Sequence, residues 1–157
     1  MKKLKYIQQQ IKNEQELCIL IDYNDIIKEF EESYEPDLLS PRYIRILKNF
    51  SKCDFINIYI LIDKDTPKKN IKKLSNKLED ITFIENINIF IEAIKSNQNK
   101  NCLLLYLGNQ NAICEFIKNK AGISIAIKTT EKTPADILLS RQKFEEILLE
   151  TNNICLA

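Results

Sequence analysis

The stretch Leu17-Cys18-Ile19-Leu20-Ile21, which stops at Asp22, decides the fold of this chain. A continuous apolar run of this kind is typical of a strand buried on both faces, as strands are in parallel sheets. Comparable runs recur along the chain, and together they predict strands at residues 17–21, 56–62, 81–84, 102–107, 123–127 and 137–139.

Stretches with helical spacing of apolar residues separate these strands. The pairs Ser40-Pro41 and Thr66-Pro67 predict helix starts, because a hydroxyl residue caps a helix and proline fits its first position. We expect helices at 4–15, 40–49, 66–78, 86–95, 111–118 and 142–150, and polar loops at 28–37 and 129–134. Such alternation implies right-handed β-α-β units. It predicts a single three-layer α/β domain over residues 1–157, with a mostly parallel sheet and helices on both faces.

Composition excludes several classes of function. The 157 residues suit one domain, and 23 Lys and Arg against 22 Asp and Glu give a net charge of +1, so global charge does not indicate a nucleic-acid binder. The chain has no histidine, which excludes imidazole-based catalysis. Its two glycines are too few for a phosphate loop or a dinucleotide fingerprint. No stretch approaches the roughly 18 apolar residues of a membrane span.

The cysteines predict an intracellular protein with reduced thiols. Their number is odd, they form no C-x-x-C pair, and no signal peptide precedes them. We therefore expect no disulfides and no zinc site, buried thiols and a cytoplasmic location. The five are Cys18, Cys53, Cys102, Cys114 and Cys155.

Polar residues follow three of the expected strands at the point where each strand ends. They are Asp22-Tyr23-Asn24-Asp25, Asp63-Lys64-Asp65 and Gly108-Asn109-Gln110-Asn111. In open parallel sheets ligands bind beyond the carboxyl ends of the strands, so these are the residues where chemistry is expected.

At these segments the chain resembles the haloacid-dehalogenase-like (HAD) phosphatases, and among them trehalose-phosphate phosphatase. That family has an apolar strand followed by D-Y-D-G-T-L, and residues 17–27 read L-C-I-L-I-D-Y-N-D-I-I. It later has Y-I-G-D-D-x-T-D-E-D-A-F and G-I-x-I-x-V, which are similar to Y-L-G-N-Q-N-A-I-C-E-F at 106–116 and G-I-S-I-A-I at 122–127. The tail at 132–140 is also similar, so the resemblance extends over most of the chain and implies a HAD-like fold.

The resemblance also implies that the catalytic site has been lost. Asp22 matches the family's nucleophile, but the acid/base position is Asn24, and an amide cannot exchange the required proton. Asp25 and Ile26 replace the family's glycine and hydroxyl residue.

The remaining motifs of the family have also lost their functional residues in this chain. The phosphate-binding hydroxyl has no counterpart at Ile62-Asp63, and no lysine stands near Glu85-Asn86. The Mg²⁺-holding acidic pair is replaced by Asn109 and Gln110, so we expect no metal, since Mg²⁺ is generally held by carboxylates. Too little chain separates Ile62 from Asn86 for the family's cap domain.

A run of lysines is the main positive feature outside these motifs. At helical spacing it gives one basic face, which could contact RNA phosphates or could simply be a solvated surface. The lysines are Lys64, Lys68, Lys69, Lys72, Lys73 and Lys77.

We expect, on this basis, a non-catalytic interaction or scaffold protein that acts as a subunit of a larger protein or ribonucleoprotein assembly. One alternative is an RNA- or ribosome-associated protein that binds through the basic helix 64–77. Another is a residual Mg²⁺-dependent phosphatase of the trehalose-phosphate phosphatase type. Asp22 is expected to cap backbone N–H groups at the strand end, and Asp63 and Asp65 to be turn residues.

Overall fold

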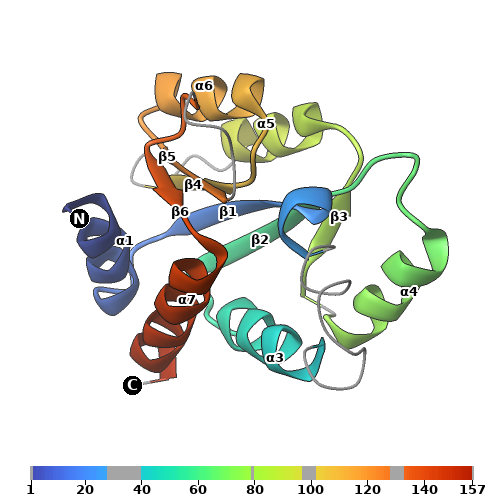
Figure 1. Cartoon of the computed structure of the whole chain (residues 1–157), viewed down its shortest axis with the longest axis horizontal. Helices are drawn as coiled ribbons and strands as arrows, with labels where there is room; N and C mark the ends of the chain where they lie inside the picture. The colour runs from blue at the N-terminus through green and yellow to red at the C-terminus, as the bar shows by residue number, and fades with distance from the viewer. Residues whose placement is uncertain (1, 28–39, 79, 97–101, 128–132, 157) are drawn as a thin grey trace.

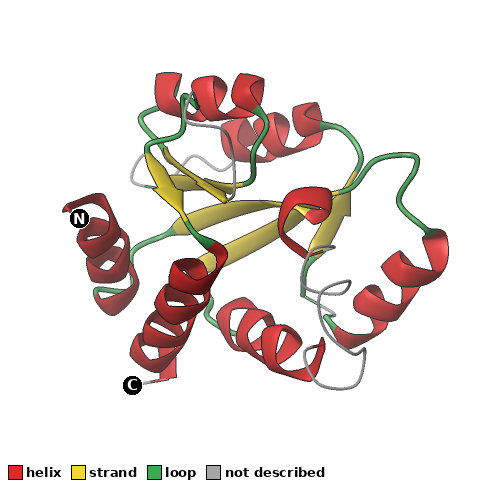
Figure 2. Ribbon diagram, viewed as in Figure 1, coloured by secondary structure: helices red, strands yellow, loops and turns green. Residues whose placement is uncertain are grey.

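The computed structural model describes residues 2–27, 40–78, 80–96, 102–127 and 133–156, with the backbone alone at 40–44, 96 and 155–156. Within these ranges six strands form one sheet in the order β3-β2-β1-β4-β5-β6, and every neighbouring pair is parallel. The strands, yellow in Figure 2, are β1 (Leu17–Asp22), β2 (Ile56–Leu61), β3 (Thr82–Ile84), β4 (Leu103–Leu107), β5 (Ile123–Ile127) and β6 (Ile137–Leu139). The three-layer α/β fold predicted from the sequence is confirmed.

Helices cover both faces of this sheet (Figure 1). Side chains of α1, α3, α4 and α7 belong to the apolar core on one face, and those of α5 and α6 to the core on the other. The helices are α1 (Lys2–Lys12), α3 (Ser40–Ser51), α4 (Lys68–Lys77), α5 (Ile87–Ser96), α6 (Asn111–Asn119) and α7 (Arg141–Leu156), and a π-helical turn, η1 (Tyr23–Ile27), follows β1. No described helix is long and apolar enough to cross a membrane.

Strand β1 shows why its continuous apolar run predicts a central strand. Leu17, Ile19 and Ile21 enter the core beneath α1, α3 and α7, while Cys18 and Leu20 enter the core beneath α5 and α6. Because successive side chains point to opposite faces, a strand covered on both sides needs apolar residues at both positions. The register aligns β1 with β2 on one side and with β4 on the other, which places Leu20 beside Tyr106.

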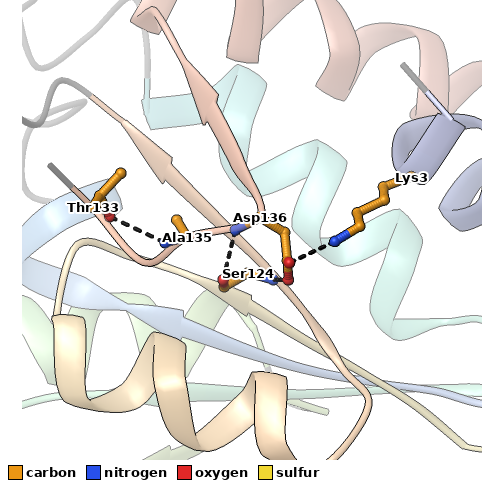
Figure 3. Close-up of polar contacts among 5 residues, drawn as sticks. All are labelled: Lys3, Ser124, Thr133, Ala135 and Asp136. Atoms are coloured by element: carbon orange, nitrogen blue, oxygen red, sulfur yellow. Dashed lines mark hydrogen bonds and ion pairs between the residues drawn. The ribbon is translucent and has the colours of Figure 1, made fainter. Parts of the chain in front are cut away.

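A polar cluster secures the β5–β6 edge to α1 (Figure 3). The Lys3 Nζ lies 2.6 Å from Asp136 Oδ1, and the Ser124 amide donates to Asp136 Oδ2 at 3.1 Å. In return, the Asp136 amide donates to the Ser124 hydroxyl oxygen at 3.2 Å. The Asp136 side chain is almost buried, so these partners replace the water that its carboxylate would otherwise bind.

Several helix boundaries differ from the sequence predictions. The first helix ends at Lys12 rather than near residue 15, because Glu14 adopts a positive φ of 54° and turns the chain toward β1. The Thr66-Pro67 cap prediction is wrong. Pro67 is the N-cap of α4 without a side-chain cap, and the Thr66 hydroxyl bonds to Asp63 instead. The last helix extends to Leu156, and the polar loop predicted at 28–37 lies outside the described residues.

Candidate functional site

The carboxyl ends of β1 and β4 bring Asp22, Tyr106 and Gln110 together. Asp22 is 2% exposed although it carries a carboxylate. Its Oδ1 accepts a hydrogen bond from the Asn24 amide at 3.2 Å, while its Oδ2 accepts one from the Tyr106 hydroxyl at 3.2 Å and another from the Gln110 side-chain amide. The expected role of Asp22 as a cap of a backbone N–H is therefore confirmed, and two side chains add to it.

The strand register explains this grouping. Leu20 lies beside Tyr106, so Asp22, two residues further on, projects from the same face of the sheet as the tyrosine ring. Gly108 makes room for the contact. A Cβ at this position would lie 2.3 Å from the Tyr106 hydroxyl and 2.8 Å from the Asp22 Cβ. Glycine is needed here for space and not for its backbone freedom.

Tyr106 stays protonated and acts as a donor toward Asp22. Burial raises the pKa of its hydroxyl far above the ordinary value near 10, and the negative charge of Asp22 raises this pKa further. The same hydroxyl oxygen accepts a hydrogen bond from the Gln110 backbone amide at 3.2 Å. The tyrosine therefore connects the end of β1 to the start of α6.

Asn24, at the position that the resemblance assigns to the acid/base, extends the network to the end of β2. Its side-chain amide donates to Asp63 Oδ2 at 2.6 Å. Asp63 Oδ1 accepts from the Asp65 amide at 2.9 Å and from the Thr66 hydroxyl at 3.1 Å. Partial desolvation raises the pKa of Asp63, but the hydrogen bonds from Asn24, Thr66 and the backbone lower it by more, so the net shift is downward. The prediction of a turn role for Asp63 is confirmed.

Asp25 and Asn109 form a second connection between the β1 and β4 ends. The Asn109 backbone amide donates to Asp25 Oδ2 at 2.7 Å. The Asn109 side-chain oxygen accepts from the Ile127 amide at 2.8 Å, at the end of β5. Both positions of the expected amide pair are thus engaged by the protein itself, Gln110 with Asp22 and Asn109 with β5.

We define the Asp22 network as the hydrogen-bonded set Asp22, Asn24, Asp25, Asp63, Thr66, Tyr106, Asn109 and Gln110. It joins the carboxyl ends of four neighbouring strands. Among the described residues, no three His, Cys, Asp or Glu side chains are grouped so that they could hold a metal ion. Both oxygens of Asp22 accept hydrogen bonds from the protein within this network.

Three members of the network were missed as site residues by sequence reasoning. Tyr106 was counted as part of an apolar strand, and Asp25 only as a replacement for a glycine. The sequence predicts Thr66 as a helix cap, whereas its hydroxyl bonds to Asp63. The signal for Tyr106 was its place opposite Leu20, which a predicted register of β1 and β4 would have given.

The other predicted positions lie apart from this network. Glu85 and Asn86 are exposed, and the Asn86 side chain accepts the Asn88 amide at 2.9 Å at the start of α5. Between β2 and α5 the described residues form only α4 and β3.

The predicted basic residues all lie on α4 or just before it. Each of the six is exposed, and none forms an ion pair with another residue that the structure describes. They are Lys64, Lys68, Lys69, Lys72, Lys73 and Lys77. The spacing therefore predicts the exposure of this surface correctly.

Comparison with known proteins adds no relative: no protein-family model matches the sequence, and no curated protein is significantly similar to it.

Proposed function

We propose that this chain is a non-catalytic interaction or scaffold protein, derived from a HAD-like phosphatase domain, that works as a subunit of a larger protein or ribonucleoprotein assembly. The observation that carries the proposal is the engagement of Asp22 by the protein itself: its carboxylate is buried and accepts bonds from Asn24, Tyr106 and Gln110. A nucleophilic carboxylate needs a free oxygen that faces substrate. Here the protein occupies both oxygens.

The donor set supports the same proposal. Mg²⁺ is bound through oxygens, usually of one or two carboxylates together with substrate phosphate. The Gln110 side-chain N–H group donates a hydrogen bond to Asp22, and the Asn109 side-chain oxygen accepts one from the Ile127 amide. These residues do not fit a magnesium ion, and Asn24 has no proton to give to a leaving group.

Hydrolysis of p-nitrophenyl phosphate in the presence of Mg²⁺ tests the absence of catalysis. We expect the wild-type protein to match Asp22→Ala at the background rate. The matched control is Asp136→Ala, which also removes a buried, hydrogen-bonded carboxylate but lies at the β5–β6 edge. Mg²⁺-dependent hydrolysis that Asp22→Ala abolishes and Asp136→Ala retains would instead establish the residual phosphatase.

Membership of an assembly is tested separately on the protein in extracts of its own cells. Size-exclusion chromatography with immunodetection should find the chain in a complex well above its own mass of 18.4 kDa. Elution as a free 18.4 kDa monomer at cellular concentration, with no stable partner, would refute the assembly role.

Binding to RNA or ribosomes through α4 is the second candidate, favoured by the exposed lysines that lack a described ion-pair partner. Phosphate contacts need charge more than they need a base-reading motif. Changing Lys68, Lys69, Lys72 and Lys73 to Glu should lower co-sedimentation with ribosomes by roughly tenfold or more at physiological salt.

A control of equal charge change separates this surface from general electrostatics. Lys2, Lys5, Lys12 and Lys118 are also exposed and lie on α1 and α6. Changing these four to Glu should leave co-sedimentation nearly intact. Equal losses in the two variants would reject α4 as the specific surface.

A further inference from the structure

Two thiols meet at the amino ends of β1 and β4, at the opposite end of these strands from the Asp22 network. The Cys18 and Cys102 sulfurs lie 2.8 Å apart although 84 positions separate them in sequence. Cys18 pairs with Leu104 in the sheet, and Cys102, two residues earlier than Leu104, projects from the same face. The sheet register therefore brings the two sulfurs together.

This pair is accessible from one side. Cys18 is buried within β1, whereas Cys102 is partly exposed and lines an open cavity of about 520 Å³. Polar side chains of α1 and the loop after it, with Lys120 opposite, form most of the cavity wall; they are Tyr6, Gln9, Gln10, Asn13 and Gln15. A small polar oxidant can therefore reach Cys102 through water, and the Cys18 sulfur lies 2.8 Å from the Cys102 sulfur.

The two thiols differ in acidity because they share a hydrogen bond. The hydrogen bond shared with Cys102 lowers the pKa of Cys18, against burial and the negative charge of Glu16. The same hydrogen bond, burial and Glu16 raise the pKa of Cys102. These directions favour the thiolate at Cys18 over that at Cys102, so Cys18 is the better nucleophile of the two.

Formation of a bond between them needs little movement. A disulfide places its sulfurs about 2 Å apart, so the 2.8 Å contact would shorten by about 0.8 Å. Cys102 precedes β4, and the first residue of that strand, Leu103, donates its amide to Glu16 at 3.0 Å. Because Cys102 lies outside the ladder, it can adjust without disturbing the strand pairing.

We propose that Cys18 and Cys102 form a reversible dithiol–disulfide site that a peroxide oxidises and a small thiol reduces. It is a modification site independent of the proposed scaffold role and of the Asp22 network. It also differs from the sequence-based expectation of reduced, buried thiols without disulfides.

Oxidation proceeds in two balanced steps. The Cys18 thiolate attacks one peroxide oxygen, and an S–O bond forms as the O–O bond breaks. The hydroxide that leaves takes up the proton that Cys18 released earlier and becomes water. The Cys102 sulfur then attacks the sulfenic acid at Cys18, and the S–S bond forms as the S–O bond breaks. The departing hydroxide takes the Cys102 proton. Overall, two thiols and one peroxide give one disulfide and two waters, and two molecules of a small thiol reverse the change.

The other described cysteines differ in their surroundings. The Cys53 sulfur lies 3.7 Å from the Asn49 carbonyl oxygen. Cys114 is fully buried in the core under α6, where burial raises the pKa of its thiol. Thiolate character and access both control the reaction with peroxide, so Cys114 should react far more slowly than the pair.

Peptide mapping of the full-length protein tests the site. Reduced protein is treated with one equivalent of hydrogen peroxide, alkylated with iodoacetamide without reductant, and digested. We expect a peptide that joins Cys18 to Cys102, lighter by two hydrogens than its separate parts, and its loss after dithiothreitol. Cys18 and Cys102 should lose alkylation together, roughly tenfold faster than Cys114.

Variants provide the controls. A protein with Cys53, Cys114 and Cys155 all changed to Ser keeps the pair and should oxidise at the wild-type rate, while Cys102→Ser should form no linkage and should accumulate a dimedone-reactive sulfenic acid at Cys18. Circular dichroism checks that each variant is folded. Full alkylation of Cys18 and Cys102 in peroxide-treated wild-type protein, or a linkage to any other cysteine, would overturn the proposal without reference to any variant.

Discussion

Strands β1 and β4 lie side by side at the centre of the sheet, and the reactive groups at their two ends have different surroundings. At the carboxyl end the Asp22 carboxylate is buried and accepts hydrogen bonds from three groups. At the amino end Cys18 and Cys102 are in contact with each other beside an open cavity. Both sets project from the same face of the sheet.

The comparison shows that the strand end where chemistry is usually found is not, in this protein, the end with the more accessible reactive groups. The carboxyl end is where parallel α/β proteins usually place their chemistry, yet its groups here satisfy one another. The amino end is the less expected place, yet it holds two sulfurs in contact, and Cys102 is partly exposed beside the cavity. We infer that the Asp22 network now stabilises the fold, whereas the thiol pair is available for reaction. Four experiments test this contrast, each measuring the free energy of unfolding.

Oxidation of the thiol pair should have the largest effect. A disulfide between Cys18 and Cys102 closes a loop that spans 84 positions, and the lower entropy of the unfolded chain should raise the free energy of unfolding by about 4 kcal/mol. Urea denaturation of peroxide-treated and reduced protein measures the difference. The same treatment of Cys102→Ser, which forms no linkage, should give no such increase, and a loss of stability on oxidation of the wild type would indicate that the linkage strains the β1–β4 pairing.

Asp22→Ala should lower the free energy of unfolding by about 3 kcal/mol, since it leaves the Tyr106 hydroxyl and the Gln110 amide without their buried acceptor. Asp22→Asn is the matched variant, because its oxygen can still accept one of these bonds, and it should lose about half as much. A catalytic carboxylate commonly costs stability, so its removal often stabilises an enzyme. An Asp22→Ala protein more stable than the wild type would therefore contradict a structural role.

The sequence predicts the framework well because burial leaves a local pattern. The apolar run of β1 and the similar runs of β4 and β5 identify strands covered on both faces, and alternation with helices implies their parallel order. Helix ends are harder, since they depend on single competing bonds. Thr66 could cap α4 or bond to Asp63, and only the folded turn decides between them.

The sequence predicts some members of the candidate site but not the hydrogen bonds that connect them. Asp22, Asn24, Asn109 and Gln110 are identified by their place after the strands. Their partners come from other strands, so the pairs depend on register and on side-chain direction. The proximity of Cys18 and Cys102 is hidden for the same reason, because nothing local relates residues 84 positions apart.

Gly108→Ala tests how tightly the carboxyl end is packed. The added methyl group would lie 2.3 Å from the Tyr106 hydroxyl, and the buried ring has to shift away from Asp22. We expect a loss of about 2 kcal/mol by urea denaturation. In the Tyr106→Leu background both the hydroxyl and the ring carbon Cζ that the methyl group would meet are absent, so the same substitution should cost less. Equal costs in both backgrounds would mean that the methyl group does not act through the tyrosine.

Tyr106→Phe should have the smallest effect at neutral pH and a distinctive one in alkali. Loss of the hydrogen bond to Asp22 should cost about 1 kcal/mol at pH 8.

The folded protein raises the pKa of Tyr106 above its value of about 10 in the unfolded chain, so the associated stability is fully present below pH 10. As the pH rises above 10, only the unfolded chain releases the proton, and the stability is lost. The advantage of the wild type over Tyr106→Phe should therefore shrink by roughly 1 kcal/mol between pH 9 and pH 11. Tyr59, whose pKa burial also raises, is present in both proteins and cancels from the comparison. A constant difference across this range would show that the Tyr106 hydroxyl reaches solvent and ionises in the folded protein, and the carboxyl end would then be open like the amino end.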